Sequence, residues 1–79
     1  MVTKQQRYHS GEDIHAGDVV RYGGVSSVIV FVNDSGEYLS GFSAAEWGYL
    51  GTGFMVRQEN GALFYLEDAD EDLELVQHA

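Results

Sequence analysis

The stretch Gly17-Asp18-Val19-Val20-Arg21-Tyr22-Gly23-Gly24, followed by Val28-Ile29-Val30-Phe31-Val32, decides the fold class of this chain. The second run is five consecutive apolar residues, mostly β-branched and bounded by turn residues, which is typical of a buried β-strand. The first contains a shorter strand, Val19 to Tyr22, after a turn at Gly17. We expect the two strands to pair as a hairpin through Gly23-Gly24, with a connection longer or more irregular than a two-residue turn.

The second half of the chain predicts more strands and one short helix. Asn60-Gly61 lies between the apolar runs 54–57 and 62–66, which predicts a hairpin with a type I′ turn. Residues 73–76 partly alternate apolar and charged side chains, as in an edge strand with one buried face. Between these regions, Ser43-Ala44-Ala45-Glu46 matches a capping box, so a short helix is expected near residues 43–50.

These elements predict a mainly β fold: a small SH3-like barrel or a strongly bent antiparallel sheet of five to six strands. The segment from Gly17 to Val30 resembles the opening hairpin of SH3-like barrels, with a Gly-Asp turn, a strand, a glycine bend and a second buried strand. The whole chain also resembles short, acidic, uncharacterised bacterial proteins with a Gly-Asp-x-Val start and a Phe-x-x-x-Glu-Trp middle, here Phe42 to Trp47. The resemblance implies a fold and brings no active residues with it.

Length and composition predict a single domain. Residues 1–11 are expected to form a polar flexible tail, and residues 12–79 a single SH3-like β domain. The chain has no cysteine, so aromatic and β-branched side chains must supply its stability. Its polar start predicts no signal peptide, and it contains no apolar run of about 20 residues. We therefore expect a cytoplasmic protein that does not enter a membrane.

The charge is strongly negative and unevenly distributed. Thirteen carboxylates face four basic residues, for a net charge of −9. From residue 8 onward, only Arg21 and Arg57 oppose the thirteen acids, a balance of −11. Such a field repels phosphate, so we expect no direct nucleic-acid binding and a preference for basic protein partners. Solubility alone is the other interpretation of the charge.

Six of the acids crowd positions 67–74. The spacing Asp68-x-Asp70-x-Asp72 suggests a calcium loop, but Leu73 stands where the loop needs glycine, and Ala79 where it needs a bidentate acid. The cluster is therefore interpreted as a solvated charge run or as a docking surface for a basic partner.

A second candidate surface is aromatic. Trp47 and Tyr49 follow Glu46 and are flanked by glycines. They either cap one end of the fold or line a groove with acids on its rim, as SH3-like domains do for proline-rich or basic peptides. The chain lacks the Ala-Leu-Tyr-Asp-Tyr signature and the tryptophan pair of peptide-binding SH3 domains. The candidate partner-binding residues are Glu67, Asp68, Asp70, Glu71, Asp72, Glu46, Trp47 and Tyr49.

We expect no catalytic, cofactor-binding or metal site. Ser43 lies in a near match to a nucleophile elbow, but a chain of 79 residues cannot supply the α/β-hydrolase sheet behind it. His9, His15 and His78 could share a metal only if the two ends of the chain met.

The sequence therefore predicts a non-enzymatic protein-interaction module whose acidic surface binds a basic partner, one concrete form being an immunity or antitoxin-like inhibitor. The alternative is a small structural barrel that completes a larger assembly, as a homodimer or a subunit. Monomer and homodimer both remain open.

Overall fold

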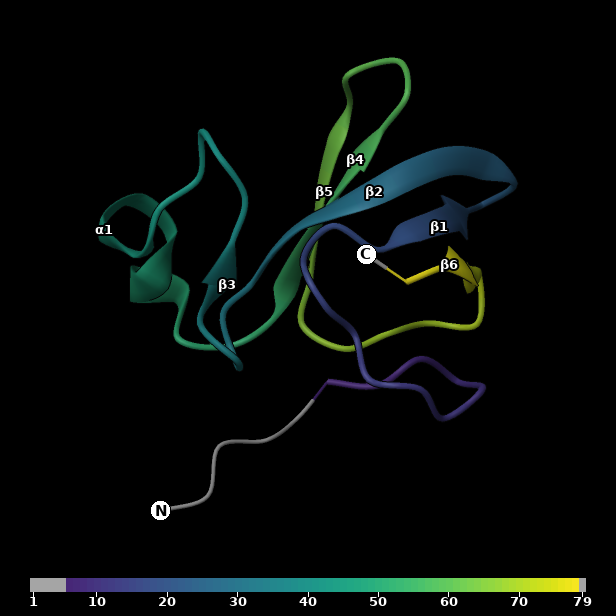
Figure 1. The fold of residues 1–79 in the computed structure, drawn as a ribbon, viewed down its shortest axis with the longest axis horizontal. Helices are drawn as coiled ribbons and strands as arrows, with labels where there is room; N and C mark the ends of the chain where they lie inside the picture. The colour runs from purple at the N-terminus through teal and green to yellow at the C-terminus, as the bar shows by residue number, and fades with distance from the viewer. Residues whose placement is uncertain (1–5, 79) are drawn as a thin grey trace.

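The computed structural model describes residues 6–78 and is mainly β (Figure 1). The expected strands form where apolar and β-branched residues lie between turn residues. The one helix is a single short turn, extended by a 3₁₀ turn. In chain order the elements are β1 (Val19–Tyr22), β2 (Val25–Val32), β3 (Glu37–Tyr38), α1 (Ala44–Trp47), η1 (Gly48–Leu50), β4 (Phe54–Gln58), β5 (Leu63–Leu66) and β6 (Leu73–Gln77).

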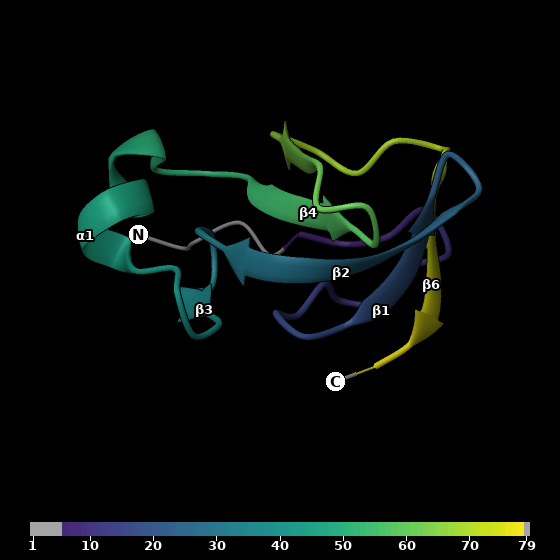
Figure 2. The same cartoon turned by 90° about the horizontal axis from the view of Figure 1, so that it is seen from above.

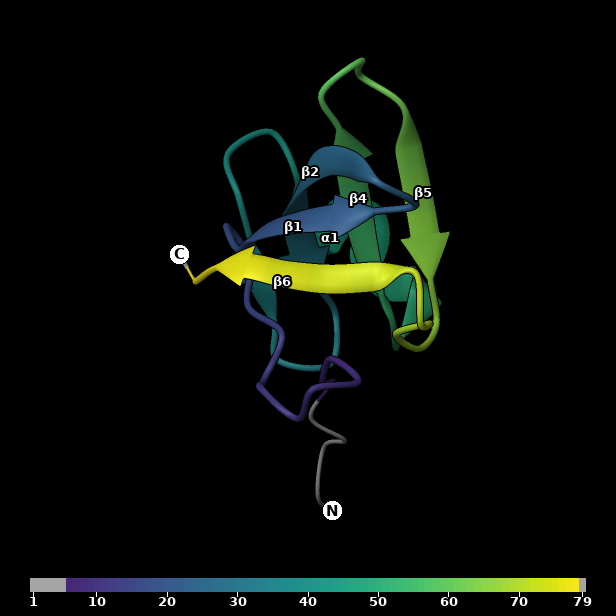
Figure 3. The same ribbon diagram turned by 90° about the vertical axis from the view of Figure 1, so that its right-hand side faces the viewer.

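The strands form one antiparallel sheet in the order β5-β4-β2-β1-β6, with β3 added to β2. Within residues 6–78, β5 and β6 are not paired with each other, so the sheet is strongly bent but not closed into a barrel. Figure 3 shows these two end strands running in very different directions. The predicted mainly β fold is confirmed, as a bent sheet with one short helix.

A bulge in β2 divides the core into two clusters. Ile29 pairs with Val56 of β4, and Phe31 pairs with the next residue, Met55, so Val30 is an extra residue in the ladder. An extra residue breaks the strict alternation of side chains and bends the strand. As a result Val30 and Phe31 join the same cluster with Met55, while Ile29 packs in the other.

The segment before β1 packs against the first of these clusters. The tail predicted over residues 1–11 needs correction where it is described: Tyr8 is a fully packed core residue, and Gln6 is buried as well. The Gln6 amide donates to Asp34 Oδ2 at 3.1 Å and to the Glu67 carbonyl at 2.7 Å. Sequence patterning missed this because isolated buried residues make no apolar run. Residues 1–5 lie outside the described residues.

Both hairpin turns differ from expectation. Tyr22 pairs with Val25, so Gly23-Gly24 is a two-residue turn, and both glycines have positive φ. The predicted longer connection is wrong, because two adjacent glycines satisfy the tight primed turns at little cost. In the second hairpin, Gly61 alone has positive φ and donates to the Gln58 carbonyl. That loop has three residues in place of the predicted type I′ turn.

The predicted capping box forms in part. The Glu46 N–H donates to Ser43 Oγ at 3.3 Å, and the Ser43 hydroxyl lies 3.4 Å from the Glu46 carboxylate. α1 and η1 lie at one end of the molecule, beside β3 (Figure 2). None of the helices in residues 6–78 combines the length and the apolar character needed to cross a membrane.

Candidate functional site

Residues 67–72, here called the acidic connection, join β5 to β6 below the sheet (Figure 1). Glu67, Asp68, Glu71 and Asp72 are exposed, and Asp70 is half-buried. Within residues 6–78, Glu67, Glu71 and Asp72 form no ion pair and no side-chain hydrogen bond. Their three charges are therefore directed to solvent.

Asp70 differs from its acidic neighbours because it holds the connection in shape. Its Oδ1 accepts the Asp72 N–H at 2.9 Å, and its Oδ2 accepts the Tyr22 hydroxyl at 3.3 Å. Its carbonyl accepts the Leu73 N–H at 3.1 Å, just where β6 begins. A carboxylate that accepts the backbone N–H two residues further along the chain forms an Asx-turn. Of the five predicted acids in the connection, Asp70 thus has a structural function.

Exposed apolar side chains lie beside the acidic connection. The Phe64 ring, on β5, is 40% exposed and lies 5.6 Å from the Tyr22 ring, which in turn reaches Asp70. Burial, and after it the charge of Asp70, raises the pKa of Tyr22. Leu63, on the same strand, is 46% exposed and lies on the opposite face of the sheet. This region therefore combines negative charge with apolar surface.

The three other predicted residues lie elsewhere. Trp47 is half-buried and stacks on Phe31 with ring centroids 5.5 Å apart, so it covers the second core cluster. Glu46 is exposed, and Tyr49 is 78% exposed. α1, which carries Glu46 and Trp47, lies at one end of the molecule, whereas the acidic connection runs toward the other (Figures 1 and 2). The structure thus separates the eight predicted residues into two groups.

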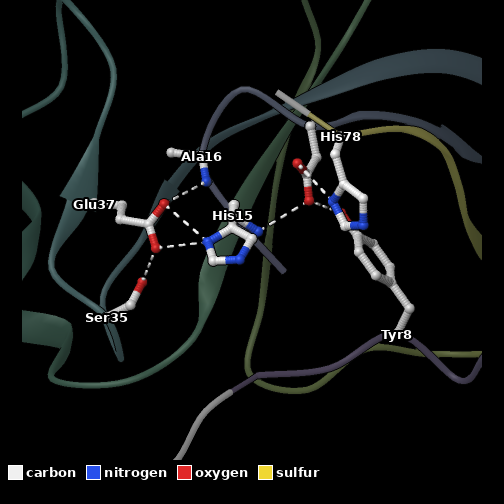
Figure 4. Close-up of polar contacts among 7 residues, drawn as sticks. Tyr8, His15, Ala16, Ser35, Glu37 and His78 are labelled. Atoms are coloured by element: carbon white, nitrogen blue, oxygen red, sulfur yellow. Dashed lines mark hydrogen bonds and ion pairs between the residues drawn. The ribbon is translucent and has the colours of Figure 1, made fainter. Parts of the chain in front are cut away.

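A third arrangement, not predicted from the sequence, joins both ends of the chain (Figure 4). His15 Nδ1 lies 3.0 Å from Glu37 Oε2, and His78 Nδ1 lies 3.4 Å from Asp18 Oδ1. The two imidazole rings are 6.3 Å apart and line one open pocket. Asp18 is fully buried and also accepts the Tyr8 hydroxyl at 2.7 Å. The only signal in the sequence was that these histidines could meet if the ends met.

Electrostatics in this cluster follow from its hydrogen bonds. The bond with Glu37 raises the pKa of His15, against the opposing effect of burial. Burial acts to raise the pKa of Glu37, but the hydrogen bonds from Ser35, His15 and Ala16 together lower it. His9 lies apart, with Nε2 3.0 Å from the Ala69 carbonyl. Among residues 6–78, no group of three or more histidine, cysteine or carboxylate side chains is placed to hold a metal ion.

The pair of His15 and Glu37 predicts a pH dependence of stability. The raised pKa of His15 gives a contribution to stability that is fully present below pH 6.5. This contribution disappears as the pH rises through the pKa of His15 in the folded protein. The lowered pKa of Glu37 gives a contribution to stability that is fully present above pH 4.5. This contribution disappears as the pH falls through the pKa of Glu37 in the folded protein. The exposed pair should contribute about 0.5 kcal/mol between those limits.

Urea unfolding of the natural chain and of His15→Gln at several pH values measures this effect. The difference in the free energy of unfolding should be greatest between pH 4.5 and 6.5 and should shrink on both sides. A difference that stays constant from pH 4 to pH 8 would show that the ion pair contributes nothing.

No protein-family model, curated protein or solved structure matches this chain.

Proposed function

We propose that this chain is a non-enzymatic protein-interaction module that binds a basic protein partner through the acidic connection. The observation that carries the proposal is that the carboxylates of Glu67, Glu71 and Asp72 are exposed without an ion pair in residues 6–78, next to the exposed Phe64. Charged side chains around apolar contact surface are the usual composition of a protein interface.

One concrete form of this function is an immunity or antitoxin-like inhibitor. In that form the carboxylates take the place of nucleic-acid phosphates and cover a positively charged active site. The net charge of −9 supports fast, electrostatically steered association with such a partner.

The second candidate function is a structural protein that associates with itself. The exposed Leu63 and Phe64 on an end strand of the sheet favour it, since an uncovered strand edge is a common site of self-association. Such association buries apolar surface and does not weaken as salt rises, whereas binding to a basic partner weakens steeply as salt rises. Sedimentation of the chain at 0.05 M and 0.5 M salt therefore distinguishes self-association from binding to a basic partner.

Neutralising the acidic connection is expected to weaken binding of a basic probe. The test variant carries Glu67→Gln, Glu71→Gln and Asp72→Asn, and leaves Asp70 intact because of its part in the turn. If each exposed charge contributes about 0.5 kcal/mol, the dissociation constant for octalysine should rise about tenfold at 0.1 M salt. Calorimetric titration measures it.

The control removes one exposed charge at the other end of the molecule, by Glu46→Gln, and is compared with Glu71→Gln alone in the acidic connection. With a screening length of about 10 Å at this salt, distant charges should change the dissociation constant less than about twofold. If both variants weaken binding equally, the charge acts only as a diffuse field, and the proposed site is wrong.

A further inference from the structure

The outer edge of β5 has no strand partner within residues 6–78, because β5 is an end strand of the sheet (Figure 3). The Gln58 N–H donates to the Ala62 carbonyl at 2.8 Å, which makes these two residues a hydrogen-bonded pair. Such pairs alternate along an antiparallel ladder. Phe64, paired with Val56, therefore directs its backbone groups toward β4, and Leu63 and Tyr65 direct theirs outward.

This edge carries no charged residue and no proline, the features with which proteins often block an open edge. Leu63 and Phe64 are 46% and 40% exposed and, as neighbours in a strand, they lie on opposite faces of the sheet. An added strand would therefore find backbone hydrogen-bonding groups along its length and apolar surface on both faces.

The surrounding charge selects the occupant. β5 leads directly into the acidic connection at Glu67, and the turn before it carries the exposed Glu59. A second copy of the chain paired at this edge would bring its own acids against these and be repelled. A segment rich in lysine and arginine is attracted instead, because charges of opposite sign then meet at both ends of the strand.

We infer that β5 accepts an extended segment of a basic protein as an additional strand. Its backbone bonds to Leu63 and Tyr65, its apolar side chains cover Leu63 and Phe64, and its basic side chains pair with the acidic connection. Addition of a strand to an exposed edge is an established mode of peptide recognition. The inference rests on the proposed function and specifies the form in which the partner binds.

Two peptides of equal charge test this inference with the full chain. The first has five central valines with two lysines at each end, so that valines lie on both faces of the added strand and lysines at both of its ends. The second has two of these valines replaced by proline, which removes two backbone donors and resists pairing. The first should bind at least about tenfold more tightly. On its binding, hydrogen exchange measured by NMR should slow at the Leu63 and Tyr65 amides. Equal affinities, or unchanged exchange at these two amides, would overturn strand addition.

A variant of the chain makes the same test from the other side. Leu63→Pro removes an outward N–H that has no role in pairing with β4, and Leu63→Ala is its control because it loses the side chain but keeps the N–H. Only the proline variant should bind both peptides equally. If Leu63→Pro does not fold, the affinities of the natural chain for the two peptides and its amide exchange still test strand addition.

The failures of the two proposals are distinguishable. If the variant neutralised at Glu67, Glu71 and Asp72 binds both peptides as tightly as the natural chain does, the proposed function is wrong. If that variant binds both more weakly while the natural chain does not distinguish the peptides, only strand addition is wrong. If exchange at the Leu63 and Tyr65 amides becomes slower as the protein concentration is raised in the absence of peptide, this edge pairs with a second copy of the chain. That result would overturn the inference.

Discussion

Replacing Asp18 with alanine is expected to lower the free energy of unfolding by about 3 kcal/mol, because the buried Tyr8 hydroxyl would lose its partner at a cost of about 2 kcal/mol and the half-buried His15 N–H at a cost of about 1 kcal/mol. The Tyr8 hydroxyl donates to Asp18 Oδ2 at 2.7 Å, and the His15 N–H donates to the same oxygen at 2.9 Å. Asp18 is fully buried, so water cannot replace its carboxylate without rearrangement. For a domain of this size the loss is a large part of the total stability.

Urea denaturation followed by Trp47 fluorescence measures this loss. Tyr8→Phe serves as the first control, since it removes one donor and leaves the acceptor, and it should cost about 1 kcal/mol. In the double variant, the effects should not add, because the two groups share one hydrogen bond. Additive losses would show that Asp18 stabilises the fold without acting through Tyr8.

The second large effect is expected for Gly53→Ala, at about 3 kcal/mol. Gly53 has φ +92°, where an alanine side chain is strained by about 1–2 kcal/mol. A Cβ at this position would also lie 2.6 Å from the Leu66 carbonyl oxygen and 2.7 Å from Tyr65 Cζ. The carbonyl belongs to β5 and cannot move without disturbing the ladder, so overpacking adds about 1–3 kcal/mol.

Gly36→Ala is the matched control, because Gly36 also has positive φ, at +72°, but a Cβ there would meet nothing within 4 Å. It should cost only the backbone strain of about 1–2 kcal/mol. Thermal unfolding of both variants measures the difference. Equal losses of stability would mean that the atoms around Gly53 can move aside for a Cβ without a further loss of stability.

The strands could be predicted because their signals are local. The β-branched run in β2, the glycines after β1 and the Asn-Gly pair before β5 each restrict the backbone of a few neighbouring residues. The turn types were predicted less well. Asn60 does not take the positive φ that a type I′ turn requires, and its Oδ1 accepts the Ala62 N–H within a three-residue loop instead.

The candidate site could be predicted only as a list of residues. The charge run located the acidic connection, but nothing local distinguishes Asp70, which organises the turn, from Glu71, which faces solvent. Nor does the sequence show that Phe64 lies beside this connection, since that contact passes through Tyr22 on another strand. Trp47 was predicted correctly as part of a short helix, and its stacking on Phe31 depends on the tertiary fold.

The sequence by itself therefore determined a mainly β domain with one short helix and a concentrated acidic segment, because apolar periodicity, turn residues and charge are properties of neighbouring residues. Only the tertiary structure decided that the sheet stays open, that Val30 forms a bulge, that Tyr8 enters the core, and that His15 and His78 meet across the ends of the chain. These features depend on packing between segments far apart in the chain, and their energies are shared among many contacts that no local pattern encodes.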